Sequence, residues 1–312
     1  MDIRQLRYFL AIVDHGGFGR AAEHLRVAQP SLSQSIAGLE RDLGAKLFHR
    51  LSRGVVLSPA GSALVEPARS VMRGLRTARE AVESVDDLLR GTVELVTMPA
   101  PGIEPLATLT RRLRKRHPGL ALRAGGAFAP GEVITHLKQG AYELGLVGVT
   151  GPIEEPGLTS LLLEDQPFSV IGAPWADIPD GEVVSPAILA GADVIESPSS
   201  GTLMRRIVDD LLRQDADVHI VAEVSHRTSL LPLVLDGVGL AIVPSAWAPM
   251  ARRAGARIAE LDLPARLSVV LLARDGVLSA PAQAFLAEAR AYRPADYFRT
   301  SIDSADAAEV QP

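Results

Sequence analysis

The sequence of 312 residues contains no cysteine, which excludes disulfide bonds, cysteine-ligated zinc, iron–sulfur clusters and thiol-based redox sensing. It also lacks any run of 18 apolar residues, so we expect no membrane-spanning helix. The first ten residues have no apolar core after a basic start, which argues against a secretory signal. The seven histidines are scattered, and no metal cluster, nucleophile elbow or phosphate-binding loop is found. We therefore expect a cytoplasmic protein that has no cofactor and is not an enzyme.

The net charge of −5 conceals a difference between the two parts of the chain. Residues 1–90 hold 13 Lys and Arg against 10 Asp and Glu, whereas the remainder holds 19 against 27. A basic first segment on an acidic body indicates that the amino-terminal part meets a polyanion. The overall composition is that of an ordinary globular protein, and the length is sufficient for two domains.

Three short segments at the start of the chain carry apolar residues at helical spacing. The first contains Ile3, Leu6, Phe9, Leu10 and Val13, and the glycines of HGGFG end it. The second, RAAEHLRV, is followed by a third helix that begins near Gln29. Two short helices, a tight junction and a further helix predict a helix-turn-helix over about residues 18–37.

The third helix has two contrasting faces when its residues are placed about 100° apart. Leu32, Ile36, Leu39 and Leu43 form the predicted buried stripe. The opposite face holds only small or uncharged side chains, namely Gln29, Pro30, Ser31, Ser33, Gln34, Ala37 and Gly38. A merely solvated face usually carries Lys and Glu, whereas Gln can pair with adenine in the major groove of DNA. A plain exposed helix start is the alternative.

The segment KLFHRLSRGVVLSPAG predicts a small hairpin that follows the third helix. Its strands are expected at Leu47–Arg50 and Val55–Leu57, with a turn at Ser52–Gly54. Arg50 and Arg53 lie near the tip, where Arg53 is able to reach a phosphate or a minor groove. A solvent-facing hairpin tip is the alternative.

This amino-terminal pattern resembles the winged helix-turn-helix of the LysR-type transcriptional regulators. The matching positions are Phe9, Gly17-Phe18, Ala21-Ala22, Leu25, Gln29-Pro30, Leu32-Ser33, Ile36, Leu39-Glu40, Leu43-Gly44, Leu47-Phe48, Arg50, Leu57 and Ala60-Gly61. The resemblance implies that the helix beginning at Gln29 enters the major groove and that the wing contacts the minor groove or the backbone. The expected DNA contacts are Gln29, Pro30, Ser31, Ser33, Gln34, Arg50 and Arg53.

Two positions depart from the family pattern, which usually has Ser or Thr at both helix starts. This chain has Gly19 and Ala28 there. Glycine is an acceptable helix cap, but alanine is a poor one and costs about 1 kcal/mol. We therefore expect somewhat weak DNA binding that depends on dimerisation.

A long helix over Pro59–Leu89 is predicted to connect the DNA-binding part to the body. Its apolar residues fall into heptads: Ala68, Leu75, Val82 and Leu89 fill one position, and Leu64, Val71, Ala78 and Val85 fill the other. The pattern favours a homodimer through the helix Leu64–Leu89, with packing inside one chain as the alternative. Pro67 removes a backbone donor and is expected to kink the helix near Ala63–Glu66.

Strands and helices alternate from residue 91 onward, which predicts α/β lobes with parallel sheets. The basic run Arg111–His117 is interpreted as the solvated face of a helix rather than a second nucleic-acid patch. The expected fold class is an all-α winged helix-turn-helix, a linker helix and a two-lobed α/β domain that resembles periplasmic binding proteins. The expected domains are residues 1–58, 59–90 and 91–300, with lobe I at 91–162 and 267–300, lobe II at 163–266 and a flexible tail at 301–312.

In open parallel sheets, ligands bind at the carboxyl ends of the strands, and this rule selects four loops. The candidate effector residues in them are Pro99, Ala100, Phe128, Ser197, Ser199, Ser200, Thr202, His226 and Thr228. The segment SPSSGT precedes a predicted helix and suits a carboxylate or another anion, or it simply caps that helix. His226 fits an anion contact and an ordinary loop position equally. The loop after Met98 offers few donors, which hints at a partly apolar effector.

The sequence thus predicts a regulator that binds double-stranded promoter DNA and is controlled by a small molecule between its lobes. The family resemblance implies a homodimer that assembles further into a homotetramer, and a contact with RNA polymerase. The alternative is a small-molecule-binding protein or an enzyme that uses the two-lobed fold without regulating DNA.

Overall fold

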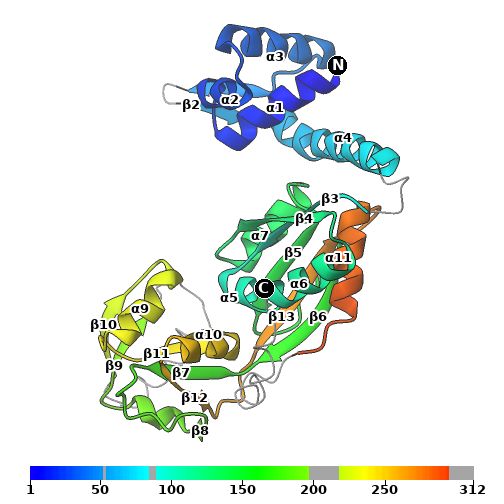
Figure 1. Cartoon of the computed structure of the whole chain (residues 1–312). Coiled ribbons are helices and arrows are strands. Elements are labelled where there is room, and N and C mark those ends of the chain that lie inside the picture. Colours follow the sequence, from blue (N-terminus) through cyan, green and yellow to red (C-terminus); the bar gives the residue numbers. More distant parts are fainter. Residues whose placement is uncertain (52–53, 84–88, 197–217, 295–312) are drawn as a thin grey trace, which may run out of the picture.

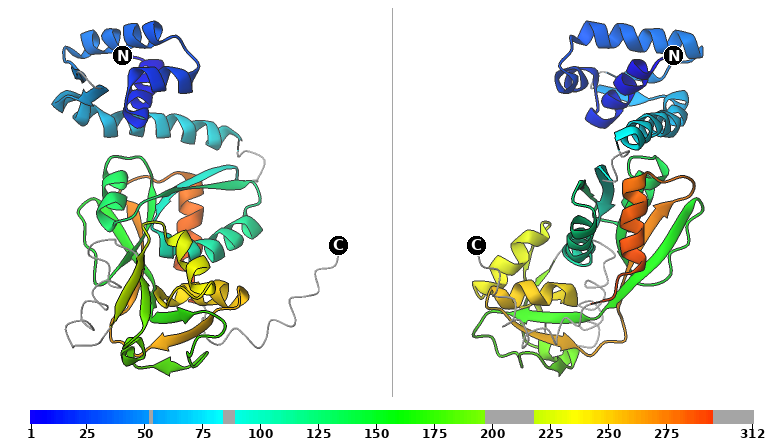
Figure 2. Two further views of the ribbon diagram at one scale, coloured as in Figure 1. Left: turned by 90° about the vertical axis from the view of Figure 1, so that its left-hand side faces the viewer. Right: turned by 45° about the vertical axis from the view of Figure 1, so that its right-hand side comes forward.

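The computed structural model describes residues 1–51, 54–83, 89–196 and 218–294. Three parts follow one another along the chain: a helical domain with a long helix, then lobe I, then lobe II (Figure 1). The chain returns from lobe II to lobe I near its end. In the views of Figures 1 and 2, the long helix lies between the helical domain and lobe I.

The first part is built from the three expected helices, α1 (Ile3–His15), α2 (Phe18–Leu25) and α3 (Gln29–Leu43). Asp2 caps α1 in a capping box with Gln5, and Gly16 ends it in the left-handed conformation that glycine adopts at low cost. The buried side chains include Phe9, Ile12, Ala21, Leu32 and Leu39. They form one cluster, which confirms the helix-turn-helix.

The wing and the long helix complete this first part. Strands β1 (Phe48–Leu51) and β2 (Gly54–Leu57) pair antiparallel, which confirms the predicted hairpin. Helix α4 (Pro59–Glu83) continues through Pro67. Its residues Val65 and Ala68 are buried in the same core as α1.

Three details of the first part differ from the expectations. Leu43 is 40% exposed and Ile3 is 47% exposed, because each stands in an end turn beyond the contact with the neighbouring helix. The N-cap of α2 is Gly17, so Gly19 lies inside the helix rather than at its start.

Lobe I contains a five-stranded sheet in the order β4-β3-β5-β13-β6. Its strands are β3 (Gly91–Thr97), β4 (Leu120–Gly126), β5 (Leu144–Val149), β6 (Leu158–Gln166) and β13 (Leu267–Arg274). Helices α6 (Leu106–Arg116) and α11 (Ala280–Arg290) share one core cluster with one face of the sheet. Helix α7 (Pro130–Lys138) covers the other face. Adjacent residues of β3 divide between the two clusters, as expected for side chains that alternate along a strand: Leu95 belongs to the first and Val96 to the second.

Lobe II contains a four-stranded sheet in the order β11-β7-β12-β8 and a parallel pair, β9 and β10. Its strands are β7 (Phe168–Gly172), β8 (Val183–Val184), β9 (Asp193–Glu196), β10 (His219–Glu223), β11 (Ala241–Pro244) and β12 (Arg257–Leu261). The described part of this lobe also contains two α-helices, α9 (Leu230–Leu235) and α10 (Ala248–Arg253). Three short 3₁₀ helices, labelled η, are η2 (Pro186–Leu189), η3 (Arg227–Ser229) and η4 (Ser245–Trp247). A bridge between Val194 and Leu240 connects β9 to the segment that precedes β11.

The expected parallel pairing is found for β3 with β4 and β5, for β9 with β10 and for β8 with β12, but not for every strand pair. β13 pairs antiparallel with both β5 and β6, and β7 pairs antiparallel with β11 and β12. β7 and β13 each begin where the chain has just crossed from one lobe to the other. Each strand therefore enters its sheet from the end opposite to that used by its neighbours. β6 also continues to Gln166, four residues beyond the expected boundary of lobe I. β13, which begins at Leu267, pairs with β5 and β6 of lobe I.

Two further elements differ from the sequence-based expectations. The segment after Met98 was expected to be a loop but forms a short helix, α5 (Pro99–Ile103). Leu89 was expected in the dimer seam but lies outside α4 and packs against the core of lobe I. The helix predicted over 202–213 lies outside the described residues.

Candidate DNA-binding and effector sites

The amino-terminal half of α3 presents the small polar face that the sequence predicts. Gln29, Pro30, Ser31 and Gln34 are exposed, and Ser33 is half-buried. On the other side Leu32, Ile36 and Leu39 are at most 2% exposed, so the inner face fixes the helix and leaves the outer one free. Ala28 occupies the N-cap position and makes no side-chain hydrogen bond there.

A carboxylate that the sequence analysis passed over joins α3 to the wing. Glu40 accepts hydrogen bonds from the Lys46 ammonium at 2.7 Å and from the backbone N–H of Leu47 at 2.9 Å. Burial opposes ionisation, but these two donors outweigh it and hold the pKa of the Glu40 carboxyl below its ordinary value. The anion therefore fixes the angle between the helix and the first strand of the wing.

Of the two arginines predicted on the wing, the structure describes only the backbone of Arg50. Arg50 lies on β1 opposite Val55, and its side chain lies outside the described residues. Arg53 lies outside them altogether, between the two paired strands.

The effector candidates within the described residues follow the ends of β3, β4 and β10. Pro99 and Ala100 begin α5, and Ala100 is 4% exposed. Phe128 is 63% exposed, and its backbone N–H donates to Glu132. His226 and Thr228 are exposed at η3. Ser197, Ser199, Ser200 and Thr202 lie outside the described residues.

Sequence reasoning missed three residues near this region. Ile103 of lobe I packs against a core cluster of lobe II that includes Trp247, so α5 connects the two lobes. Between His226 and Thr228, Arg227 is half-buried, and burial lowers the pKa of its guanidinium below the ordinary value. The signal was available in the segment SHRTS, where the arginine stands between two polar residues that were selected.

Two kinds of feature are absent from the described residues. None of the helices in that part of the chain is both long enough and apolar enough to span a bilayer. No group of three or more His, Asp or Glu side chains there is arranged to hold a metal ion.

Two family models match the chain in succession. Residues 3–62 match the model described as a bacterial regulatory helix-turn-helix protein of the lysR family. Residues 86–293 match the LysR substrate binding domain, which is more than half of the chain. The boundary between the two matches falls within α4 and the segment after it.

Similar proteins extend along most of the chain. The HTH-type transcriptional regulator ShiR of Corynebacterium glutamicum is 32% identical over 244 residues, which are 78% of this chain and 82% of that protein. The nitrogen assimilation regulatory protein nac of Klebsiella aerogenes is 28% identical over 91% of this chain and 92% of its own length.

Solved structures share the same fold. Full-length CbnR in complex with its target DNA superimposes with a TM-score of 0.66 at 20% identity, covering 93% of this chain and 99% of that one. A full-length OxyR variant of Pseudomonas aeruginosa gives a TM-score of 0.67 at 20% identity, with coverage of 93% and 95%. With its winged helix-turn-helix, its two-lobed domain and both family matches, the chain belongs to the LysR family of DNA-binding transcriptional regulators with an effector-binding domain.

Proposed function

We propose that α3 reads the major groove of double-stranded promoter DNA through Gln29, Pro30, Ser31, Ser33 and Gln34. The observation that carries this proposal is the exposed, small and uncharged face of α3 opposite a fully buried stripe. Short side chains allow the helix backbone to approach the base edges closely, and the amide of Gln34 can donate to and accept from adenine. Arg50 and Arg53 on the wing then bind phosphate or the minor groove and set the register.

We further propose that a partly apolar carboxylate binds between the lobes. Arg227 supports this choice: it is a half-buried cation, and within the described residues it takes part in no ion pair. A carboxylate matches a guanidinium in charge and in planar geometry. His226, Thr228 and the loop of Ser197, Ser199, Ser200 and Thr202 are proposed as polar partners, with Pro99, Ala100 and Phe128 as the apolar wall.

The proposed assembly is a homodimer through α4 that pairs into a homotetramer. Val71 is 48% exposed and Ala78 is exposed, so part of the predicted seam remains available to a second copy. Ala68 of the other heptad position is buried within its own chain, which limits the seam to the later turns. We propose that the protein acts in the cytoplasm, contacts RNA polymerase and catalyses no reaction.

The DNA proposal is tested by fluorescence anisotropy with DNA from upstream of the chain's own gene. Gln34→Ala should weaken binding to that DNA by about 5- to 100-fold and leave binding to random DNA unchanged. Gln139→Ala removes the same side chain from an exposed position on lobe I and should have no effect. Equal affinity of the wild type and Gln34→Ala for the promoter DNA would reject the proposed readout.

The wing is tested by its salt dependence. Arg53→Gln should weaken specific and random DNA equally and reduce the slope of log affinity against log salt by about 0.9. An unchanged slope would exclude a phosphate contact by this residue.

The effector proposal is tested by a thermal-shift screen of small carboxylic acids. A binding acid should raise the melting temperature of the wild type and not that of Arg227→Met. Trp247 fluorescence in a Trp175→Phe background should respond as well, because Trp247 lies in the cluster that α5 contacts. A stabilising acid that acts equally on Arg227→Met would remove Arg227 from the site.

A further inference from the structure

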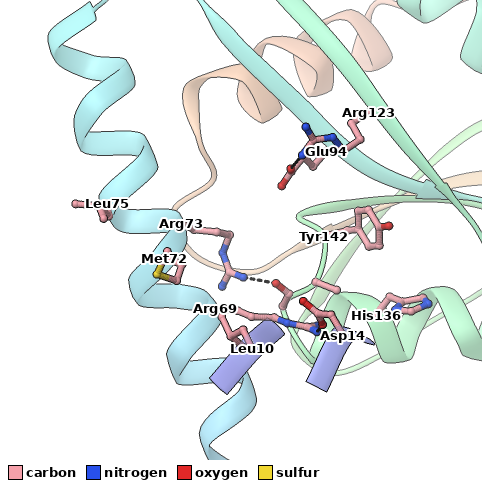
Figure 3. Close-up of a pocket in the computed structure, with 12 residues that line it drawn as sticks. Leu10, Asp14, Arg69, Met72, Arg73, Leu75, Glu94, Arg123, His136 and Tyr142 are labelled. Carbon is pink, nitrogen blue, oxygen red and sulfur yellow. Dashed lines mark hydrogen bonds and ion pairs between the residues drawn. The ribbon is translucent and has the colours of Figure 1, made fainter. Parts of the chain in front are cut away.

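A hollow of about 630 Å³ lies between the DNA-binding part and lobe I, beside the middle of β3 and β4 and the segment before β5. Its walls come from α1, α4, β3, β4 and α7 (Figure 3). The residues lining it are Leu10, Asp14, Arg69, Met72, Arg73, Leu75, Glu94, Arg123, His136, Gly140, Ala141 and Tyr142. The size is that of a small-molecule site.

Arginines from both sides converge on this hollow. Arg69 and Arg73 stand one turn apart on α4, and Arg123 comes from β4. Arg73 donates to the carbonyl of Gly140, as the dashed line in Figure 3 shows. Arg274, at the end of β13, reaches the same place.

Gly140 permits this convergence. A Cβ at residue 140 would lie 2.5 Å from Nη1 of Arg274 and 2.6 Å from Nη1 of Arg73, closer than real Cβ contacts allow. The residue also has φ +67°, a conformation that favours glycine. Glycine at residue 140 therefore leaves room for two guanidinium groups beside the hollow.

Two donors at the hollow have no acceptor among the described residues. Arg69 pairs with Asp14, and Arg274 pairs with Glu66, in each case through Nη2. In the part of the chain that the structure describes, Nη1 of Arg69 and Nη1 of Arg274 are buried and make no hydrogen bond. A buried charged donor without an acceptor is costly, so each of these two donors is suited to bind an acceptor oxygen of a ligand.

Ion pairs join the described charged side chains around the hollow. Four arginines, Arg69, Arg73, Arg123 and Arg274, and three carboxylates of the described residues lie at this junction. The carboxylates are Asp14, Glu66 and Glu94, and each is already paired with one of these arginines. None of these three carboxylates bonds to Nη1 of Arg69 or Nη1 of Arg274, so the ion pairs leave both donors available to a ligand.

We propose that this hollow binds a small anion with carboxylate or phosphate oxygens, which accept hydrogen bonds from Arg69 and Arg274. Guanidinium groups bind both oxyanions through charge-assisted bonds. Because one wall is α4 and the other is lobe I, the anion binds most tightly when the two are together. The ligand therefore holds the DNA-binding part against lobe I. This site is separate from the effector site proposed at Arg227.

The test is titration calorimetry on the full chain with inorganic phosphate and, separately, citrate, at constant ionic strength made up with chloride. The wild type should bind one of the two, and the stronger of them identifies the oxyanion class. Arg69→Met should weaken binding about tenfold or more. Lys115→Met removes the same charge from an exposed position on α6 and should bind like the wild type. Arg227→Met should also bind like the wild type, which separates this site from the effector site.

A second variant guards against misfolding. The Arg123 side chain is 72% exposed, so Arg123→Gln is expected to fold and still to bind more weakly. No saturable binding of either anion by the wild type, or equal weakening by Lys115→Met, would overturn the proposal.

The effect on α4 has its own readout. The chain has no cysteine, so introduced cysteines are the only sites that a thiol-reactive spin label modifies. The two introduced cysteines are Glu23→Cys on α2 and Ala107→Cys on α6, and the distance between their labels is measured. Labelled protein diluted with unlabelled chain reports distances within one protomer. The bound anion should narrow the distance distribution, and an unchanged distribution at saturation would overturn the coupling to α4.

Discussion

Arg274 donates a hydrogen bond of 2.5 Å to Glu66, although the two residues lie 208 positions apart. Glu66 belongs to α4 and Arg274 to β13, so this pair joins the DNA-binding part to lobe I. Glu66 is also 3.5 Å from Arg73, which in turn bonds the carbonyl of Gly140. These contacts join α4 directly to lobe I.

The first prediction concerns this ion pair. Because the Glu66 side chain is 40% exposed, solvent screens the pair, and its coupling energy is expected to be about 0.5–1 kcal/mol. A double-mutant cycle with Glu66→Gln and Arg274→Met, followed by urea unfolding, measures this value. Additive effects of the two substitutions would show that the pair contributes nothing.

The second prediction concerns the packing of Gly61 against the wing. A Cβ at residue 61 would lie 2.1 Å from the carbonyl oxygen of Leu47, and backbone must move to admit it. Gly61→Ala should destabilise the winged helix by about 1–3 kcal/mol. Gly74→Ala in α4 meets open space and should stabilise that helix by about 0.5–1 kcal/mol.

These two glycine variants are compared by far-UV circular dichroism. Both tryptophans, Trp175 and Trp247, belong to lobe II, so their fluorescence is an internal control. Gly61→Ala should lower the melting temperature of the winged helix, which is followed by circular dichroism. The melting temperature of lobe II, which is followed by tryptophan fluorescence, should not change. A variant as stable as the wild type would contradict the close contact with Leu47.

The third prediction concerns the uncapped start of α3. Pro30 has no N–H, so a serine at residue 28 would accept from the N–H of Ser31, and the gain is about 1 kcal/mol. If DNA binding depends on this helix end, Ala28→Ser should tighten binding about fivefold in a titration at fixed salt. Unchanged or weaker binding would contradict the expectation.

The fourth prediction is a pH dependence at Glu104, beside the crossing between the lobes. Burial raises the pKa of this carboxyl above its ordinary 4.5, and the charge of Glu164 adds to the effect despite hydrogen bonds from Thr108. The unfolded chain loses this proton at lower pH than the folded chain. At pH values above the raised pKa, the ionised carboxylate of Glu104 therefore lowers the free energy of unfolding. This loss of stability disappears as the pH falls below 4.5.

Glu104→Gln should accordingly stabilise the protein at pH 7 and have no such effect at pH 4. The amide oxygen retains one acceptor for Thr108, so the comparison isolates the charge. Urea unfolding at the two pH values measures the difference. A variant that is equally stabilised at both would show that ionisation is not the cause.

The winged helix was predictable because its signals are local. Gly16 and Gly44 end two helices where the apolar spacing stops. The exception is Leu43, which fits the helical spacing but stands in the last turn with nothing packed above it.

The lobes were predictable as alternating elements but not in strand direction. A strand such as β13 has the same apolar residues whichever way it enters the sheet, and only the chain crossing sets its direction. The segment of α5 was misread because prolines suggest a loop. Pro99 stands in the first turn, where its missing N–H has no helical acceptor to lose.

One candidate site was predictable from local sequence patterns, and the other was not. The face of α3 follows from the spacing of neighbouring residues on one helix, so the sequence predicts it. The hollow beside α4 depends on partners such as Asp14 with Arg69, 55 positions apart, and Arg73 with Gly140, 67 positions apart. No local pattern encodes such pairs.

The place of β13 between β5 and β6 has a consequence for synthesis on the ribosome. The chain emerges from its amino terminus, so lobe II has all its strands once Leu261 has been made. Lobe I begins earlier but lacks its joining strand until Arg274 emerges. Until then β5 and β6 each lack the neighbour that β13 provides, and such unpaired strand edges can pair with another nascent chain.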